Sequence, residues 1–199
     1  MQNLPIGIQT FNEIIDNNYL YIDKTEVFAK LLNSGKYFFL SRPRRFGKSL
    51  LVSTLKEIFR GNKELFKNLY IYDEYDWNEK YPVIHLSMSN LKGTENLTSV
   101  YESAYLMLET NAIENGISLK KYDNPAIMFS KLISELSKIN KVVVLIDEYD
   151  KPIVDHLTQN DVCKRNINFL RDFYSVLKDY DEHIKFCLLT GVSKFSKVS

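Results

Sequence analysis

The amino-acid sequence predicts an α/β fold in which helices cover both faces of a mainly parallel β-sheet, making three layers. Three observations lead to this prediction. Short apolar runs of β character alternate along the chain with longer helical patterns. The first run leads directly into a basic loop, RPRRFGKS, and then into a helix. The third run ends in two adjacent acids, Asp147 and Glu148. Strands that alternate with helices are typical of parallel sheets.

Size and composition indicate one soluble domain. The 199 residues are 45% hydrophobic and 26% charged, which is ordinary for a chain long enough to bury a substantial core. Lys and Arg number 26 against 25 Asp and Glu, and the net charge of +1 gives no support for wholesale attraction to nucleic acid or membranes. No apolar run approaches the roughly 20 residues that cross a bilayer, and the amino terminus has no signal-peptide pattern. We expect a cytoplasmic protein with no membrane partner.

The first part of the chain predicts two helical segments, a strand and a longer helix. Residues 11–18 form a short amphipathic stretch, and Asp23 or Thr25 is expected to cap a helix that runs to residue 33. The apolar run 36–40 is short enough for a buried strand. After the basic loop, apolar residues recur on one face of a helix over 49–61.

The second part predicts three further strands separated by helices. Residues 64–82 are aromatic and irregular, and long helical patterns follow the next strand. We expect strands at 83–89, 141–150 and 184–193, a helical hairpin from 96 to 139 interrupted at 115–125, and a helix over 161–179.

The basic loop matches most of a phosphate-binding loop of the form G-x-x-x-x-G-K-[ST]. Gly47, Lys48 and Ser49 fill the second half, where backbone amides, a lysine and a hydroxyl contact phosphate and Mg²⁺. Arg42 stands where the first glycine is usual, so the turn must be one that a residue with a Cβ adopts. The alternative is that GKS merely begins a helix beside a basic turn. We predict that the nucleotide-binding loop residues are Arg44, Arg45, Phe46, Gly47, Lys48, Ser49 and Leu50.

The acidic pair at the end of the third strand supplies the context for this loop. In a P-loop ATPase the first acid holds Mg²⁺ through water and the second polarises the attacking water, and these roles suit Asp147 and Glu148. The alternative is that the acids simply end a buried strand at the surface. Thr190 ends the fourth strand, and its hydroxyl would lie beside the acids if the strands are parallel. There it would sense the γ-phosphate or orient water, although a Thr-Gly pair is also common in plain turns.

Five blocks of sequence resemble, in order, the bacterial AAA-ATPase-like family, including its R-P-R-R-x-G-K-S loop. They are YIDKT, FLSRPRRFGKSLLVSTL, YPVIHL, VVVLIDEYDKPI and LLTGVSKFSKVS. The resemblance implies a P-loop NTPase fold with an ATPase core of the additional-strand type, in which another strand separates the loop strand from the acidic strand. It also implies that Lys48 and Ser49 bind phosphates and Mg²⁺, that Asp147 supports the metal, and that Glu148 is the catalytic base.

The resemblance also bears on the extent of the chain. Longer members continue with another strand, a helical region and often a restriction-like nuclease domain, so the sequence looks like an N-terminal portion, truncated at the C-terminus. We expect a helical lead-in at 1–35, packed on an incomplete P-loop core at 36–199. The loop strand would then have an open edge, prone to self-association. Any contact with nucleic acid is left to the absent C-terminal region.

Two further groups of residues are candidates for contact with the nucleotide. Arg44 and Arg45 either contact phosphates or form a solvated basic turn. Tyr21 and Asp23 precede the loop strand by one helix, and we hypothesise that they fold over the base and ribose of the nucleotide.

The function that the sequence favours is ATP binding with Mg²⁺-dependent ATP hydrolysis, in which Glu148, Lys48 and Thr190 are the catalytic residues. Ser49 and Asp147 are the predicted metal ligands. A second interpretation is a nucleotide-gated interaction switch that hydrolyses little or no ATP. A third is a P-loop kinase acting on a small acceptor, which the adjacent acids disfavour because they suit water as the acceptor.

Overall fold

A computed structural model describes residues 2–92 and 94–194 of the chain, and its centre is a four-stranded sheet. All strand pairs are parallel, which confirms the predicted class, and the order across the sheet is β1-β4-β3-β2. The strands are β1 (Tyr37–Ser41), β2 (Val83–Ser87), β3 (Val142–Asp147) and β4 (Ile184–Gly191). Because β4 lies between β1 and β3, the loop strand and the acidic strand are not neighbours, as expected.

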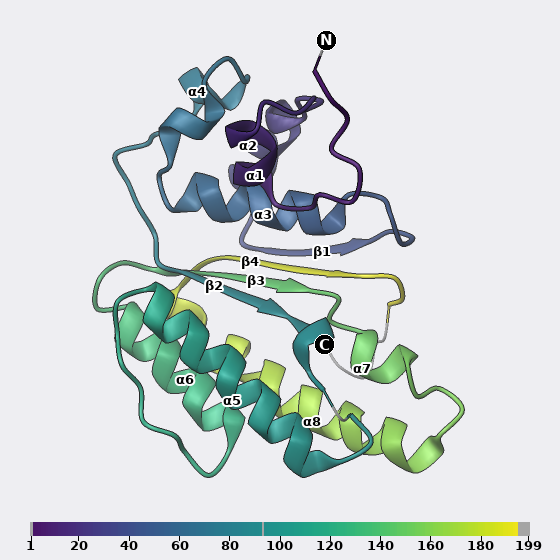
Figure 1. Cartoon of the computed structure of the whole chain (residues 1–199). Coiled ribbons are helices and arrows are strands. Elements are labelled where there is room, and N and C mark those ends of the chain that lie inside the picture. The colour runs from purple at the N-terminus through teal and green to yellow at the C-terminus, as the bar shows by residue number, and fades with distance from the viewer. Residues whose placement is uncertain (1, 93, 195–199) are drawn as a thin grey trace.

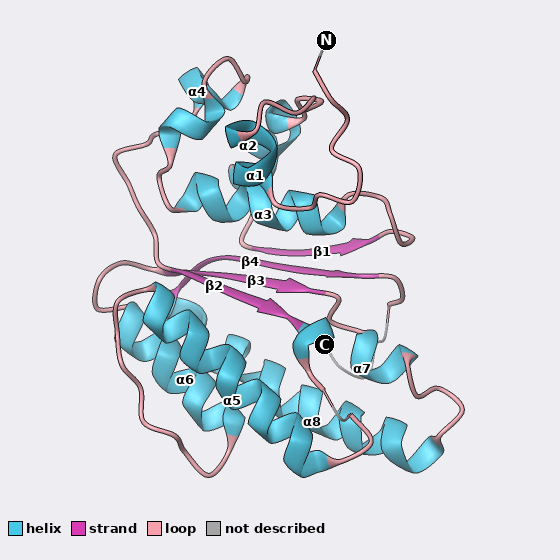
Figure 2. Cartoon of the chain, in the orientation of Figure 1, coloured by secondary structure: helices cyan, strands magenta, loops and turns pink. Residues whose placement is uncertain are grey.

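Helices cover both faces of the sheet, so the predicted three layers are present (Figures 1 and 2). The face on the side of the amino terminus carries α1 (Phe11–Asp16), α2 (Thr25–Leu32), α3 (Lys48–Phe59) and α4 (Ile71–Glu74). The opposite face carries α5 (Leu97–Glu114), α6 (Pro125–Leu136) and α8 (Asn160–Asp179). The short α7 (Lys151–Val154) follows β3, and 3₁₀ turns span Lys63–Phe66, Met88–Asn90 and Asp181–His183.

Strand β3 is buried on both faces and divides the apolar interior into two cores. Val143 and Leu145 pack with α1, α2 and α3, whereas Val144 and Ile146 pack with α5, α6 and α8. A strand covered on both sides has no reason to alternate polar and apolar residues. This explains why its sequence reads as an unbroken apolar run.

Element boundaries differ from the predicted ones by a few residues. The predicted hairpin is the pair α5 and α6, and each helix has an asparagine N-cap: Asn96 accepts a hydrogen bond from the Thr98 amide, and Asn124 from the Ala126 amide. Strand β3 ends at Asp147 instead of residue 150, because the chain turns at Glu148, whose φ is +54°. The division into 1–35 and 36–199 stays a prediction.

The two edges of the sheet are protected differently. Along β2, the side-chain amide of Asn111 donates to the carbonyl of His85 and accepts from its amide, at 2.9 and 2.7 Å. Asn115, the residue that follows α5, does the same for Val83 at 3.0 and 3.2 Å. These two amides replace a neighbouring strand. No described strand covers the outer edge of β1, where Tyr37 and Phe39 are 46% and 41% exposed.

No helix among residues 2–92 and 94–194 is both long and apolar enough to cross a membrane. Of the block LLTGVSKFSKVS, residues 195–199 lie outside the described residues.

Candidate functional site

The predicted loop and acids meet at the carboxyl ends of the strands. A cavity of about 690 Å³ lies there, between the loop, the start of α3 and the residue that follows β3. It is lined by Ile6, Gly7, Ile8, Gln9, Arg44, Arg45, Gly47, Lys48, Ser49, Leu50 and Glu148. Ligands of open parallel sheets bind outside the carboxyl ends of the strands, so this is the expected place for a site.

The backbone of the loop explains how arginine is accepted in place of the first glycine. The amide of Arg42 donates to the carbonyl of Gly191 at 3.1 Å and so continues the pairing of β1 with β4. The left-handed positions of the loop are instead Arg45, with φ +68°, and Gly47, with φ +73°. A residue with a Cβ therefore fits at position 42, and the unusual residue is Arg45, which holds a conformation that normally favours glycine.

Lys48 is held at the centre of the loop. Its side chain is buried, and Nζ donates to the carbonyls of Arg42 and Pro43, both at 3.0 Å. Lys48 is also the first residue of α3, and the first amides of a helix have no partners within it. The loop therefore presents an ammonium group and a helix amino terminus to the same cavity, which favours a bound anion.

Asp147 and Glu148 face different surroundings. Asp147 is 5% exposed, and its Oδ1 accepts hydrogen bonds from the hydroxyl of Thr190 and, at 3.0 Å, from the amide of Glu148. Glu148 lines the cavity in a left-handed conformation. Thr190 lies beside the acids, as the strand order requires, but it is fully buried and contacts Asp147 without lining the cavity. It thus orients Asp147.

The segment after β4 is hydrogen-bonded to the residues after β3. The sequence did not predict this contact. Oδ2 of Asp150, a buried residue, accepts hydrogen bonds from the amides of Val192 and Ser193 at 2.9 and 2.6 Å. The Tyr149 hydroxyl donates to the carbonyl of Ser193 at 2.8 Å. A Cβ on Gly191 would lie 2.7 Å from Oδ1 of Asp150, so only glycine fits there. The second aspartate of the D-E-Y-D sequence, Asp150, was the available signal.

The amino-terminal residues that reach the cavity are not those that the sequence predicted. Residues 6–9 line it, with the side chain of Ile6 87% exposed and Gly7 in a turn at φ +79°. Asp23 instead accepts hydrogen bonds from the amides of Thr25 and Tyr70, both at 2.8 Å.

Tyr21 likewise does not line the phosphate-loop cavity. Its ring packs against Phe11, with the ring centres 5.1 Å apart, and burial raises the pKa of Tyr21 to about 12. The structure does not bring Tyr21 or Asp23 to the loop.

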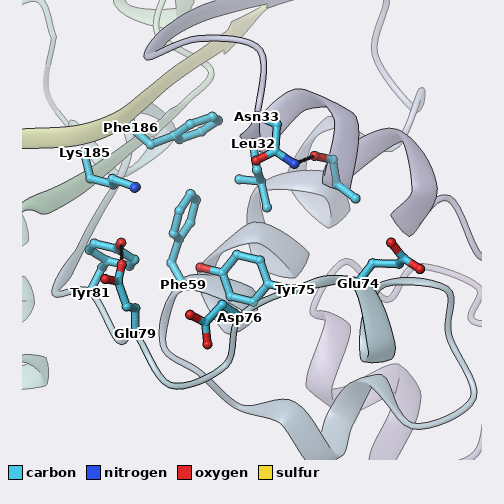
Figure 3. A pocket seen from close by; sticks show the side chains of 11 residues that line it. Leu32, Asn33, Phe59, Glu74, Tyr75, Asp76, Glu79, Tyr81, Lys185 and Phe186 are labelled. Atoms are coloured by element: carbon cyan, nitrogen blue, oxygen red, sulfur yellow. Dashed lines mark hydrogen bonds between the residues drawn. The ribbon is translucent and has the colours of Figure 1, made fainter.

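A cavity at the opposite ends of the strands has the wrong charge for polyphosphate. It measures about 280 Å³ and lies between α2, the segment after α4 and the start of β4 (Figure 3). Three acids line it, Glu74, Asp76 and Glu79, against one cation, Lys185, whose Nζ lies 5.2 Å from the centre of the Tyr81 ring. The phosphate-loop cavity, with three basic residues and one acid, is the better place for an anion.

The residues at the phosphate-loop cavity fit Mg²⁺ better than a metal held by protein side chains alone. No group of three or more His, Cys, Asp or Glu residues able to hold a metal exists within residues 2–92 and 94–194. Mg²⁺ is usually held by one or two protein oxygens together with phosphate and water oxygens. The Ser49 hydroxyl, which lines this cavity, and the second carboxylate oxygen of Asp147, a residue that lines the adjoining cavity, are donors of that kind.

Comparison with known proteins agrees with this geometry. Residues 5–199 match a family described as predicted AAA-ATPase. The chain is also 43% identical over 203 residues to a protein of Azotobacter chroococcum mcd 1 whose name reads "Uncharacterized protein in vnfD 5'region". All of the chain is covered, but it spans 39% of the length of that relative. No solved structure matches the chain.

The left-handed conformation of Glu148 predicts a measurable gain in stability on substitution. Glu148→Gly should raise the free energy of unfolding by about 1 kcal/mol relative to Glu148→Ala, because only the alanine variant keeps the strained Cβ. Both variants lose the same carboxylate, so their difference reports the strain less the larger entropy that glycine loses on folding. Urea unfolding monitored by circular dichroism checks this, and equal midpoints for the two variants would contradict it.

Proposed function

The chain belongs to the AAA-ATPase-like family, and from that premise we propose that it binds ATP with Mg²⁺ and hydrolyses the bound ATP. The observation that carries the proposal is the single cavity lined on one side by Arg44, Lys48 and Ser49 and on the other by Glu148. Hydrolysis needs a phosphate-binding group and a base that approach one reacting atom, and this cavity has both.

The triphosphate would bind along the loop. The amides of residues 46–48 and the amino terminus of α3 would surround the β-phosphate, and Lys48 would exchange its carbonyl partners for phosphate oxygens. Arg44 and Arg45 line the same cavity, which supports a phosphate contact over a purely solvated turn. Bound Mg²⁺ would neutralise the charge that develops on the β- and γ-phosphate oxygens, and Ser49 and Asp147 would hold it.

Water would attack the γ-phosphorus from the side of Glu148. The bond from the phosphorus to the β–γ bridging oxygen breaks as the bond to the water oxygen forms, and the carboxylate of Glu148 accepts the proton that the water loses. The products are ADP and inorganic phosphate. Thr190 contributes through Asp147, because its hydroxyl fixes one carboxylate oxygen and leaves the other for the metal. Catalysis would rest mainly on positioning and electrostatics.

The turn at residues 6–9 is the segment best placed to contact the adenine base of ATP. Ile6 is an exposed apolar side chain at the edge of the cavity, and its burial against a purine ring would remove apolar surface from water. Gly7 has φ +79°, so a side chain there would strain the turn. A role for Tyr21 and Asp23 over the base stays a prediction, and the calorimetric experiment below includes a variant that tests it.

One observation favours the second interpretation, a nucleotide-gated switch. Thr190 contacts Asp147, and two residues later the chain is fastened to Asp150. A change at the γ-phosphate position would therefore reach residues 192 and 193 through a short rigid path. Such a path serves a switch whether or not ATP is hydrolysed, so turnover decides between the two functions.

Phosphate-loop function predicts the outcome of Mg-ATP titration by calorimetry. The parent chain should bind Mg-ATP, and Lys48→Ala should raise Kd at least about tenfold, because one charged phosphate contact exceeds about 1.4 kcal/mol. Lys30→Ala, an exposed lysine on α2, is the control and should leave Kd unchanged. No binding by a folded parent would contradict the proposal. An unchanged Kd in a Tyr21→Ala, Asp23→Ala double variant would count against a role for those residues.

The assignment of Glu148 predicts that binding and turnover separate. Glu148→Gln keeps the shape of the side chain but cannot accept the proton, so kcat should fall at least about 100-fold while the Kd for Mg-ATP stays within about threefold. Steady-state phosphate release measures kcat. If the parent binds Mg-ATP but releases no phosphate, hydrolysis is wrong and the switch is supported.

The open edge of β1 predicts self-association of the 199-residue chain. An uncovered strand pairs readily with another strand, and Tyr37 and Phe39 are partly exposed along it. Light scattering should show a mass that rises with concentration, and Phe39→Lys should reduce the rise because a charge on an edge strand opposes pairing. A monodisperse monomer at all concentrations would exclude this association.

A further inference from the structure

A second cavity adjoins the phosphate-loop cavity and leads away from it. It measures about 450 Å³ and shares Gln9, Ser49 and Glu148 with the first. Every residue that lines it is polar or charged: Gln9, Thr10, Asn12, Ser49, Ser53, Lys56, Glu57, Arg60, His85, Ser87, Ser89, Asp147 and Glu148. A groove without apolar walls offers nothing to an apolar ligand, whereas it suits water and small hydrated ions.

The groove follows α3 from the phosphate-binding end to the other end. Ser49, Ser53, Lys56 and Arg60 are spaced by three or four residues and therefore lie on one side of the helix. They span 11 residues, which at 1.5 Å per residue is about 16 Å. The groove thus begins beside the proposed γ-phosphate position and reaches the last turn of the helix.

Two cations share one carboxylate at the far end. Lys56 and Arg60 both bond to Oε2 of Glu114, at 2.9 and 2.8 Å, which leaves this group of three with a net charge of +1. Glu57 also lines the groove, but its carboxylate accepts a hydrogen bond from the Asn62 side chain. A lysine has three N–H donors and an arginine five, so both cations keep donors for a further partner.

His85 adds a polar atom without a partner at the same place. Its Nε2 is fully buried and makes no hydrogen bond within the described residues. Burial, together with the charge of Lys56, lowers the pKa of His85, so the ring is neutral at pH 7. A buried nitrogen left unpaired is unfavourable, and such atoms call for an explanation.

We propose that inorganic phosphate leaves through this groove after hydrolysis, and that His85, Lys56 and Arg60 form a transient phosphate site along it. The inference rests on the proposed ATP hydrolysis. While ADP is still bound to the loop, the groove beside Glu148 offers the inorganic phosphate a polar route from the γ-phosphate position to solvent. The ion HPO₄²⁻ accepts hydrogen bonds from the two cations, and the imidazole ring of His85 lines the groove beside them.

The charge of the groove favours release of phosphate over its tight binding. Two cations, Lys56 and Arg60, and three acids, Glu57, Asp147 and Glu148, line the groove, so phosphate would be held by hydrogen bonds and not by an excess of positive charge. Weak binding allows departure, whereas a strongly basic pocket would retain the product and compete with the next turnover.

Phosphate binding at this place is tested directly by NMR of the imidazole rings. The chain has three histidines, and His156 and His183 serve as internal references. Titration of the nucleotide-free protein with inorganic phosphate at constant ionic strength should shift the His85 signals saturably at millimolar concentrations, with the references unchanged. The shift should persist in Lys48→Ala, which removes loop binding, and vanish in Lys56→Met. No shift, or an equal linear shift of all three histidines, would overturn the proposal.

Kinetics test the exit route separately. In a single turnover, ATP cleavage is followed by acid quench and free phosphate by a fluorescent phosphate sensor. Lys56→Met should leave cleavage within about twofold but delay phosphate appearance at least threefold, whereas Lys36→Met, at the other end of the sheet, should do neither. Equal delays in parent and Lys56→Met would overturn the route. Absence of cleavage in the parent would instead overturn the proposed hydrolysis, and the phosphate site would be judged on the NMR titration.

Discussion

The rest of the structure depends on β4 pairing in parallel with both β1 and β3. In register, Leu40 lies opposite Thr190 and Ser41 opposite Gly191, and on the other side Leu189 lies opposite Ile146. The end of β1, which starts the phosphate loop, is therefore aligned with the end of β3, which provides the acids. One further hydrogen bond, from Arg42 to Gly191, extends this alignment into the loop. A shift of β4 by one residue would bring Leu189 or Gly191 to the place of Thr190 and turn the Thr190 hydroxyl away from Asp147.

The parts of this arrangement that the sequence predicts are those set by local pattern. The apolar runs of the four strands and the helical periodicity of α3 and α8 depend on residues close in sequence. The alignment of Lys48 with Asp147 follows from parallel strands once those strands are recognised. Asn111, Asp150 and the turn at residues 6–9 act through contacts with distant segments. Only Asp150 has a local signal, its place in the D-E-Y-D sequence. Arg42 is an intermediate case. The sequence shows that it replaces the first glycine of the loop pattern, but only the folded backbone shows that this position does not need glycine.

Strain is concentrated where the proposed chemistry takes place. Among the described residues, four residues other than glycine have positive φ. Two of them, Arg45 and Glu148, line the phosphate-loop cavity. The other two, Asn18 and Asn68, are asparagines, which tolerate this conformation better. A left-handed arginine or glutamate costs stability that a glycine would avoid. Their presence is physically reasonable if the guanidinium and the carboxylate must be held at these two points, which is the requirement of a site that positions phosphate and water.

The polar groove is fixed by the same asparagine contacts that close the edge of β2. Asn111 binds the backbone of His85 on both its amide and its carbonyl, so the strand cannot shift without breaking two hydrogen bonds. Glu114, three residues further along α5, joins Lys56 and Arg60 of α3. Helix α5 therefore holds β2 and α3 at a set separation, and the groove lies between them. Because this side of the sheet is closed and the β1 side is open, association of the chain through β1 would leave the groove unobstructed.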